Sequence, residues 1–313
     1  MKPNLLTMIA VVAVLLPAAA LGADQISRTG QPVPAAAAPT VSDTFPSLAS
    51  GALTHARIAE LPAGSLVRAG ELAITAKQLD DEIAKVPEAV RDQLRKNGFF
   101  LVEQLVARQL LIREAKAAGS AADADERMQL RALLESIAAK VSVSDEEIAA
   151  FYTKNKDMFD GAELASAKTF IKDMVLQQKQ QDAVDSHVRT LGRRVTIEVS
   201  SAWAKQQAVL AQDNPVDKAR ASGKPSVVDF GAKGCIPCDK LAPILETLRT
   251  KYEARANVVF VSVREEQVLA ARYGIQSIPV QIFFDKQGKE VFRHVGFYPQ
   301  EAIEKQLAEM GVK

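Results

Sequence analysis

The two cysteines of this 313-residue chain stand one helical turn apart, in the run Cys235-Ile236-Pro237-Cys238. The apolar stretch 227–230 before them predicts a buried strand, and the pattern over 239–252 after them predicts a helix. The pair therefore falls at a junction between strand and helix. Because the chain holds no third cysteine, a scaffold of several disulfides is impossible, and the spacing indicates redox chemistry.

Two other uses of the cysteine pair remain open from the sequence. A zinc half-site would need two further ligands, and His55, His187 and His294 are scattered without ligand spacing. A purely structural disulfide across so short a loop would gain little stability from chain entropy, and it would not need a helix start. A redox pair accounts for more of the pattern than either alternative.

A helix start is a favourable place for a thiol that attacks disulfides, since the attacking species is the thiolate. The positive end of the helix dipole and the free backbone N–H groups would lower the pKa of Cys235. Cys238 lies one turn later, close enough to resolve a mixed disulfide. Pro237 falls near the first helical turn, where a missing N–H is tolerated.

Two further residues are candidates for the same site. Asp229 falls among apolar neighbours on the predicted strand, so we expect a desolvated carboxyl with a raised pKa that exchanges a proton with Cys238. The alternative is a solvated carboxyl at the strand end. Pro279 opens a second buried strand, and a cis bond after Ile278 would present the Ile278 backbone to an extended peptide. The alternative is a trans proline at a strand edge.

The N-terminus has the features of a secretory signal peptide over 1–22. Lys2 supplies the positive charge, an apolar run of about a dozen residues follows, and small residues precede the expected cleavage site. The apolar run is shorter than the ~20 residues of a membrane-spanning helix, although an uncleaved anchor is the alternative. Residues 23–56, rich in Ala and Pro, are expected to be a disordered linker. We therefore expect a soluble protein in the periplasm or another extracytoplasmic space.

The rest of the chain divides into a mostly α-helical domain over 57–200, a linking helix over 201–214 and an α/β domain over 215–313. In the helical domain, Thr75 and Ser144 each begin a capping box, and a hairpin over 66–74 is expected to pair with a strand over 195–199. The α/β domain alternates strands and helices around a central sheet. Net charge is +1, so nothing in the charge indicates nucleic-acid binding.

The helical domain resembles the peptide-binding domain of SurA/parvulin-type periplasmic foldases over about 60–200. The segments that carry the resemblance include "LVEQLVARQLLIREAKAAG" and "VSVSDEEIAAFYTKNKDMF". In that family a prolyl-isomerase domain commonly follows the second segment. Here Phe159 leads through Asp160 and Gly161 directly into the closing helix, so we expect no prolyl isomerase activity. The apolar stripe from Phe99 to Ile112 fits either a core or a peptide groove.

The α/β domain resembles the thioredoxin family in "VVDFGAKGCIPCDKLAPILETL" and "AARYGIQSIPVQIFFDKQGKEVFRHVGF". The resemblance implies a thioredoxin fold with Cys235 as the nucleophile, Cys238 as the resolving thiol and Asp229 as the buried acid. It further implies that Pro279 is the cis-proline and that Gly296 lets substrate approach. Together with these two, Ile278, Ile236 and Pro237 form the expected substrate-binding residues.

Two departures from the thioredoxin pattern bear on the reduction potential of the Cys235–Cys238 pair and on the pKa of Asp229. The tryptophan that usually precedes the first cysteine is Gly234 here. The buried lysine that often pairs with the aspartate is replaced by an apolar residue near Phe260. Lys233 is a substitute source of positive charge near Cys235.

The sequence as a whole predicts an exported thiol–disulfide oxidoreductase, favoured as a reductase, that acts on cell-envelope proteins held by a chaperone-like domain. Its expected partners are unfolded or disulfide-bearing exported proteins and a redox partner, expected to be membrane-bound. No metal and no cofactor beyond the Cys235–Cys238 disulfide is expected. The alternatives are a non-enzymatic holdase or assembly chaperone, and a disulfide oxidase or isomerase.

Overall fold

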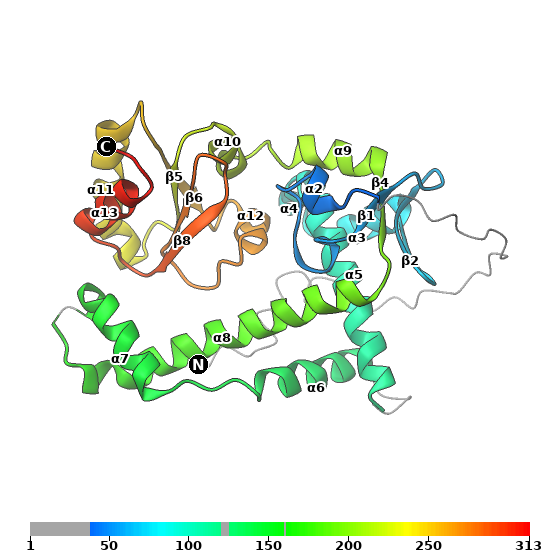
Figure 1. The fold of residues 1–313 in the computed structure, drawn as a ribbon, viewed down its shortest axis with the longest axis horizontal. Helices are drawn as coiled ribbons and strands as arrows, with labels where there is room; N and C mark the ends of the chain where they lie inside the picture. Colours follow the sequence, from blue (N-terminus) through cyan, green and yellow to red (C-terminus); the bar gives the residue numbers. More distant parts are fainter. Residues whose placement is uncertain (1–37, 120–124, 160) are drawn as a thin grey trace. The chain divides into compact units, whose positions relative to one another are not determined.

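A computed structural model of the chain describes residues 38–119, 125–159 and 161–313 (Figure 1). The fold divides into two compact units, one from Met1–Glu135 with Asp185–Ala208, the other from Ser136–Val184 with Val209–Lys313. The expected signal peptide over 1–22 and the first part of the expected linker lie outside the described residues. Within the described ranges, no helix has both the length and the apolar character to cross a membrane.

The first unit contains one four-stranded sheet and most of the N-terminal helices. Its strands are β1 (Arg57–Ala59), β2 (Ser65–Ala69), β3 (Leu72–Thr75) and β4 (Glu198–Ser200). Its helices include α2 (Val41–Thr44), η1 (Gly51–Leu53), α3 (Ala76–Ala84), α4 (Glu88–Lys96), α5 (Gly98–Ala117) and α9 (Ser201–Leu210). Two further helices, α6 (Glu126–Ala138) and α8 (Leu164–Arg194), contribute residues to both units.

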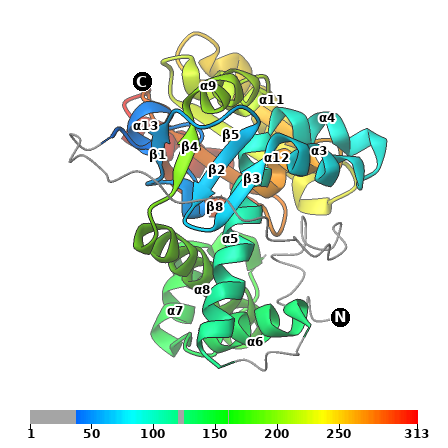
Figure 2. The ribbon, with the colours of Figure 1, turned by 90° about the vertical axis from the view of Figure 1, so that its right-hand side faces the viewer.

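The sheet of the first unit joins the two ends of the helical region (Figure 2). Its order is β1-β4-β2-β3, with β2 and β3 forming an antiparallel hairpin and β4 running antiparallel to β2. The expected pairing of the late strand with the early hairpin is therefore confirmed. Both capping boxes are present as well, at Thr75 with Gln78 and at Ser144 with Glu147.

The expected disordered linker over 23–56 is wrong for residues 38–56. Thr40 caps α2, and Val41 and Leu53 are completely buried. The backbone N–H of Ala52 donates to Glu103 Oε1 at 2.9 Å, which ties the segment to α5. Burial raises the pKa of the Glu103 carboxyl to about 7. The buried apolar residues and the bond to Glu103 help to order a stretch whose average composition indicated disorder.

The apolar stripe of α5 belongs to a core. Phe99, Val102, Val106 and Ile112 are all buried, and the Phe99 ring stacks on Trp203 of α9 with centroids 5.5 Å apart. These side chains are therefore packed inside the first unit. Among the described residues, the stripe forms part of a core and not the peptide groove that the sequence left as an alternative.

A helical hairpin precedes the α/β part of the second unit. Helix α7 (Asp145–Lys154) is followed by η2 (Lys156–Phe159) and then by α8. Ile148 and Ile171 are buried where α7 and α8 pack. The hydroxyl of Tyr152 donates to the carbonyl of Ala162 at 2.9 Å, which ties the end of this hairpin's first arm to the residues that lead into α8.

The α/β part is a sheet with helices on both faces. Its strands are β5 (Ser226–Gly231), β6 (Asn257–Ser262), β7 (Val280–Phe284) and β8 (Glu290–Val295). Its helices are α10 (Pro215–Ala221), α11 (Ile236–Tyr252), α12 (Gln267–Arg272) and α13 (Gln300–Glu309). The order is β6-β5-β7-β8, with β5 parallel to β6 and antiparallel to β7. This arrangement confirms the α/β domain expected from the sequence.

Strand alternation decides which side chains meet which helices. On β5, Val227 packs in a core with α11 and α13, whereas Val228 and Phe230 pack in a second core with α10 and α12. Asp229 shares the side of Val227, and so it faces the helix that carries the cysteines.

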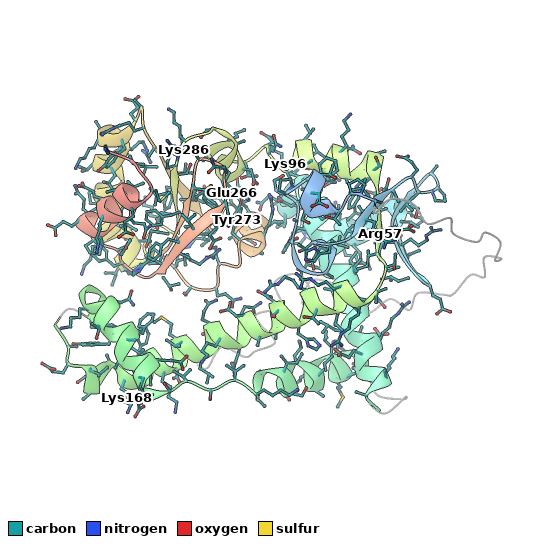
Figure 3. The ribbon with its side chains drawn as sticks, in the orientation of Figure 1. Arg57, Lys96, Lys168, Glu266, Tyr273 and Lys286 are labelled. Carbon is teal, nitrogen blue, oxygen red and sulfur yellow. A yellow bond between two sulfur atoms is a disulfide. The ribbon has the colours of Figure 1, made fainter. Side chains whose placement is uncertain are left out.

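A buried ionic network closes the other face of the sheet. The carboxylate of Asp217 accepts bonds from Arg272 Nη1 at 2.6 Å and from the hydroxyl of Tyr273 at 2.9 Å (Tyr273 is labelled in Figure 3). Asn214 caps α10 and also donates to Asp217. Because every one of these groups is paired, α10 is fixed to α12 without leaving a lone buried charge.

Candidate redox site

The cysteine pair lies where β5 passes into α11, as the sequence predicts. Cys235 occupies the N-cap position of α11, and the two sulfur atoms form a disulfide. Cys238, inside the first turn, is buried, whereas Cys235 is half-buried and Ile236 is 74% exposed. Gly234 has φ +83°, a conformation that a side chain would disfavour, and this turn brings Cys235 to the helix start. Of the two cysteines, Cys235 is thus the more accessible.

Ile278 and Pro279 lie beside the accessible sulfur, and Gly296 lies beside Pro279. The Ile278–Pro279 peptide bond is cis, so the alternative of a trans proline at a strand edge is wrong. Cys235 Sγ lies 4.0 Å from the Ile278 carbonyl oxygen. The backbone N–H of Gly296 donates to the Pro279 carbonyl at 2.8 Å, with φ +102° at the glycine. The structure thus brings together three separate segments of the chain.

Asp229 lies on the same side of the sheet, and its side chain is buried with 1% exposure. Burial raises the pKa of its carboxyl to about 6, and a hydrogen bond from Gln281 offsets part of that effect. The sequence alternative of a solvated carboxyl at the strand end is therefore wrong.

Gln281 is a neighbour of this site that the sequence reasoning missed. It lies opposite Asp229 in the β5–β7 register, it is completely buried, and its Nε2 donates to Asp229 Oδ1 at 2.7 Å. A polar residue inside the otherwise apolar run 280–284 was the available signal. Phe260 lies opposite Asp229 on β6, which places an apolar ring where the family pattern often has a lysine.

Gly231 is the second missed residue. A methyl group added there would lie 3.0 Å from Phe260 Cε2, 3.3 Å from Asp229 Oδ2 and 3.4 Å from Cys238 Cβ. Because position 231 has no side chain, Asp229 Oδ2 and Cys238 Cβ both come close to its backbone, and a larger residue there would press on both.

The histidines take no part in a metal site with the cysteines. His187 contacts Glu114, His55 contacts Arg193, and His294 is stacked on Tyr298. Over residues 38–119, 125–159 and 161–313, no group of three or more His, Cys, Asp or Glu side chains is arranged to hold a metal.

Comparison with known proteins agrees with this geometry. Residues 212–311 match the family described as "Thioredoxin-like domain". The thioredoxins of Staphylococcus aureus strains Mu50 / ATCC 700699 and MW2 are each 43% identical over 77 residues, which are 25% of this chain and 73% of the thioredoxin.

The chain belongs to the thioredoxin family. Membership rests on its C-terminal part, since the matched family covers 212–311. Among solved structures, Fasciola hepatica thioredoxin is 31% identical with a TM-score of 0.26, over 28% of this chain and 82% of that one. A mutant thioredoxin from Halobacterium salinarum NRC-1 is 32% identical with a TM-score of 0.29, over 31% of this chain and 83% of that one.

A thioredoxin-like domain with a disulfide at the start of α11 implies a thiol–disulfide oxidoreductase. The match to that family does not extend to the helical region before residue 212. The resemblance of that region to the SurA-type foldases therefore stays a prediction from the sequence.

Replacing the buried carboxyl tests its electrostatic state. The folded protein binds the Asp229 proton more tightly than the unfolded chain, so this group favours folding at low pH and loses that contribution as pH rises through about 6. Asp229→Asn keeps an acceptor for Gln281 and removes the charge. We predict that it raises the free energy of unfolding at pH 8 by on the order of 2 kcal/mol and changes it little at pH 4.

Hydrogen exchange at the amides of β5 and β7 would measure this effect in the full chain. Asp213→Asn, at an exposed carboxylate of the same domain, is the matched control and should change little at either pH. Equal destabilisation by Asp229→Asn at both pH values would contradict the account.

Proposed function

We propose that this protein is an exported thiol–disulfide oxidoreductase that reduces disulfides in cell-envelope proteins held by its helical domain. The observation that carries the proposal is the pairing of an accessible Cys235, at the start of α11, with a buried Cys238. A structural staple has no need of one cysteine that is more accessible than the other and lies beside the Ile278 carbonyl.

The first step uses Cys235 as the nucleophile. Its thiolate, favoured by the N-terminal end of α11, attacks one sulfur of a client disulfide. A bond forms between Cys235 Sγ and that sulfur, the client S–S bond breaks, and the client's other sulfur leaves as a thiolate. The product is a mixed disulfide.

The second step uses Cys238 and Asp229. Asp229 accepts the Cys238 proton, and the resulting thiolate attacks Cys235 Sγ. The Cys235–Cys238 disulfide closes, the mixed disulfide breaks, and the second client thiolate leaves. The client has gained two electrons, which the dithiol has lost. The surroundings of Gly231 support this assignment because Asp229 Oδ2 and Cys238 Cβ both lie close to this residue.

The client chain is bound in extended form by the backbone around the cis-proline. The Ile278 carbonyl lies next to Cys235 Sγ, and Gly296 adds no side chain beside Pro279. Exposed Ile236, followed by Pro237, forms an apolar edge on the helix side. These contacts are sequence-tolerant, which suits an enzyme that meets many clients.

The helical region binds the client chain in this proposal, because the order of its segments resembles that of the SurA-type peptide-binding domain. Linking two binding modules raises the effective concentration of the held chain at Cys235. The signal-like N-terminus supports export, and the direct passage from Phe159 into the closing helix supports a function without prolyl isomerisation. A reductase in an oxidising space needs an electron donor, for which a membrane-bound thiol–disulfide partner is the class we propose.

A second candidate is a holdase that does not use its cysteines. It is favoured by exposed apolar side chains on the helices, Met128 on α6 and Phe170 on α8. The two candidates differ in what the cysteines are for, and cysteine variants separate them.

Replacing each cysteine in turn by serine should separate the two steps of the reaction. With Cys238→Ser, the full chain should accumulate a mixed disulfide between Cys235 and a disulfide-bearing client, because nothing resolves it. With Cys235→Ser, no adduct should form, and reduction should fall by at least about 100-fold. Non-reducing electrophoresis and mass mapping of the adduct would measure both. If Cys235→Ser rescues clients in cells as well as the native chain does, the holdase is the correct function.

The direction of electron flow is set by the reduction potential of the pair. Pro237 and Ile278 match the reducing members of the family, so we predict a reduction potential of about −270 mV for the Cys235–Cys238 pair. Equilibration of the full chain with glutathione buffers, followed by alkylation and mass analysis, would measure it. A value near about −120 mV would instead identify an oxidase.

A further inference from the structure

The pair formed by Asp229 and Gln281 is an unusual feature of the apolar face beneath α11. Both side chains are at most 1% exposed, and they are joined by the bond from Gln281 Nε2 to Asp229 Oδ1 at 2.7 Å. Within the described part of the chain, the remaining oxygens, Asp229 Oδ2 and Gln281 Oε1, meet no hydrogen-bond donor. Two unsatisfied buried oxygens are costly, which indicates a use beyond stability.

The bond decides which oxygen of Asp229 is free. Because Gln281 holds Oδ1, Oδ2 is the oxygen left without a partner beside Gly231, and Cys238 Cβ lies beside the same glycine. The unbonded oxygen of the carboxylate and the resolving cysteine are therefore both next to Gly231.

We propose that Gln281 is a positioning residue for proton transfer between Asp229 and Cys238, holding Oδ1 so that Oδ2 exchanges the proton. This inference rests on the proposed function of the cysteine pair. In the transfer, the S–H bond of Cys238 breaks, an O–H bond forms at Asp229 Oδ2, and the electron pair stays on sulfur.

An amide suits this position better than a lysine or a hydrocarbon would. When Asp229 is ionised, its Oδ1 accepts from Gln281 Nε2. When the proton is on Oδ2, Oδ1 is a carbonyl oxygen and still accepts the same bond. The same residue therefore serves both states of the carboxyl. A lysine would favour the anion alone, and a hydrocarbon would leave both states without a partner.

The surroundings of the pair contain few other charges. Phe260 faces Asp229 from β6, Cys238 faces it from α11, and Gln281 faces it from β7. The nearest titratable group along this row is His294, which lies opposite Gln281 on β8 and whose Nε2 contacts the Phe297 carbonyl. Among the described residues, the Gln281 bond is the hydrogen bond that opposes the effect of burial on the pKa of Asp229.

Two substitutions with opposite effects test the proposal. Gln281→Met keeps the volume and removes the donor, so the pKa of Asp229 should rise by one unit or more, a tenfold tighter hold on the proton. Gln281→Lys places a cation there, so the pKa should fall by one unit or more. Carbon NMR of the Asp229 carboxyl would follow the titration in the oxidised full chain, assigned by its absence in Asp229→Asn.

A second readout separates positioning from packing. A glutathione adduct on Cys235 is resolved by Cys238, and the release of glutathione after a jump in pH reports this step without any client. The rate of glutathione release should have its pH inflection at a higher pH in Gln281→Met and at a lower pH in Gln281→Lys. Both shifts should equal those of the carboxyl pKa. Gln287→Met, in the exposed turn after β7, is the matched control and should move neither.

Four results would overturn the proposal: both variants leave the carboxyl pKa unchanged, both move it in one direction, the pKa moves without the inflection, or the inflection moves without the pKa. If Gln281→Met does not fold, Gln281→Leu removes the same donor. Neither readout requires the reduction of a client. A chain that fails to reduce clients would contradict the proposed function, and the two readouts would still test the role of Gln281.

Discussion

The start of α11 is the feature on which the rest of the site depends. One short connection takes the chain out of the buried strand β5, through a glycine with positive φ, and into a helix whose N-cap residue is Cys235. The helix end concentrates partial positive charge at the sulfur that solvent reaches. The same turn hides Cys238, so a difference in accessibility between two identical thiols follows from backbone geometry alone.

The face of the sheet beneath that helix adds a second constraint, which is desolvation. Val227, Leu241 and Phe283 make this face apolar, and a carboxyl placed among them strongly favours its neutral form. Asp229 is held near the middle of the useful pH range because burial and one amide bond act in opposite directions. A group with such a balance accepts and returns a proton readily, and this property is what the resolving cysteine requires.

The sequence was sufficient where the signals are local. The strand before the cysteines, the helix after them and the capping boxes at Thr75 and Ser144 each depend on residues a few positions apart. The burial of Asp229 followed from its apolar neighbours in the chain. The cis bond before Pro279 and the place of Gly296 were expected because of the family resemblance, and periodicity alone does not predict them.

The sequence was insufficient where partners are distant. Gln281 meets Asp229 only through the register of two strands that lie far apart in the chain, which no local pattern encodes. Gly231 matters because of what surrounds it in space. The segment 38–56 was misjudged because its average composition hides the anchors at Val41 and Leu53 and the bond to Glu103.

The acidity of Cys235 in the reduced chain is the most direct test of this account. The rate of its alkylation by iodoacetamide should be measured against pH in the full chain, with the modified peptide quantified by mass spectrometry. Stabilisation by the helix start predicts a rate inflection at about pH 7 or below. An inflection near about pH 8.5, the value of an ordinary thiol, would contradict it.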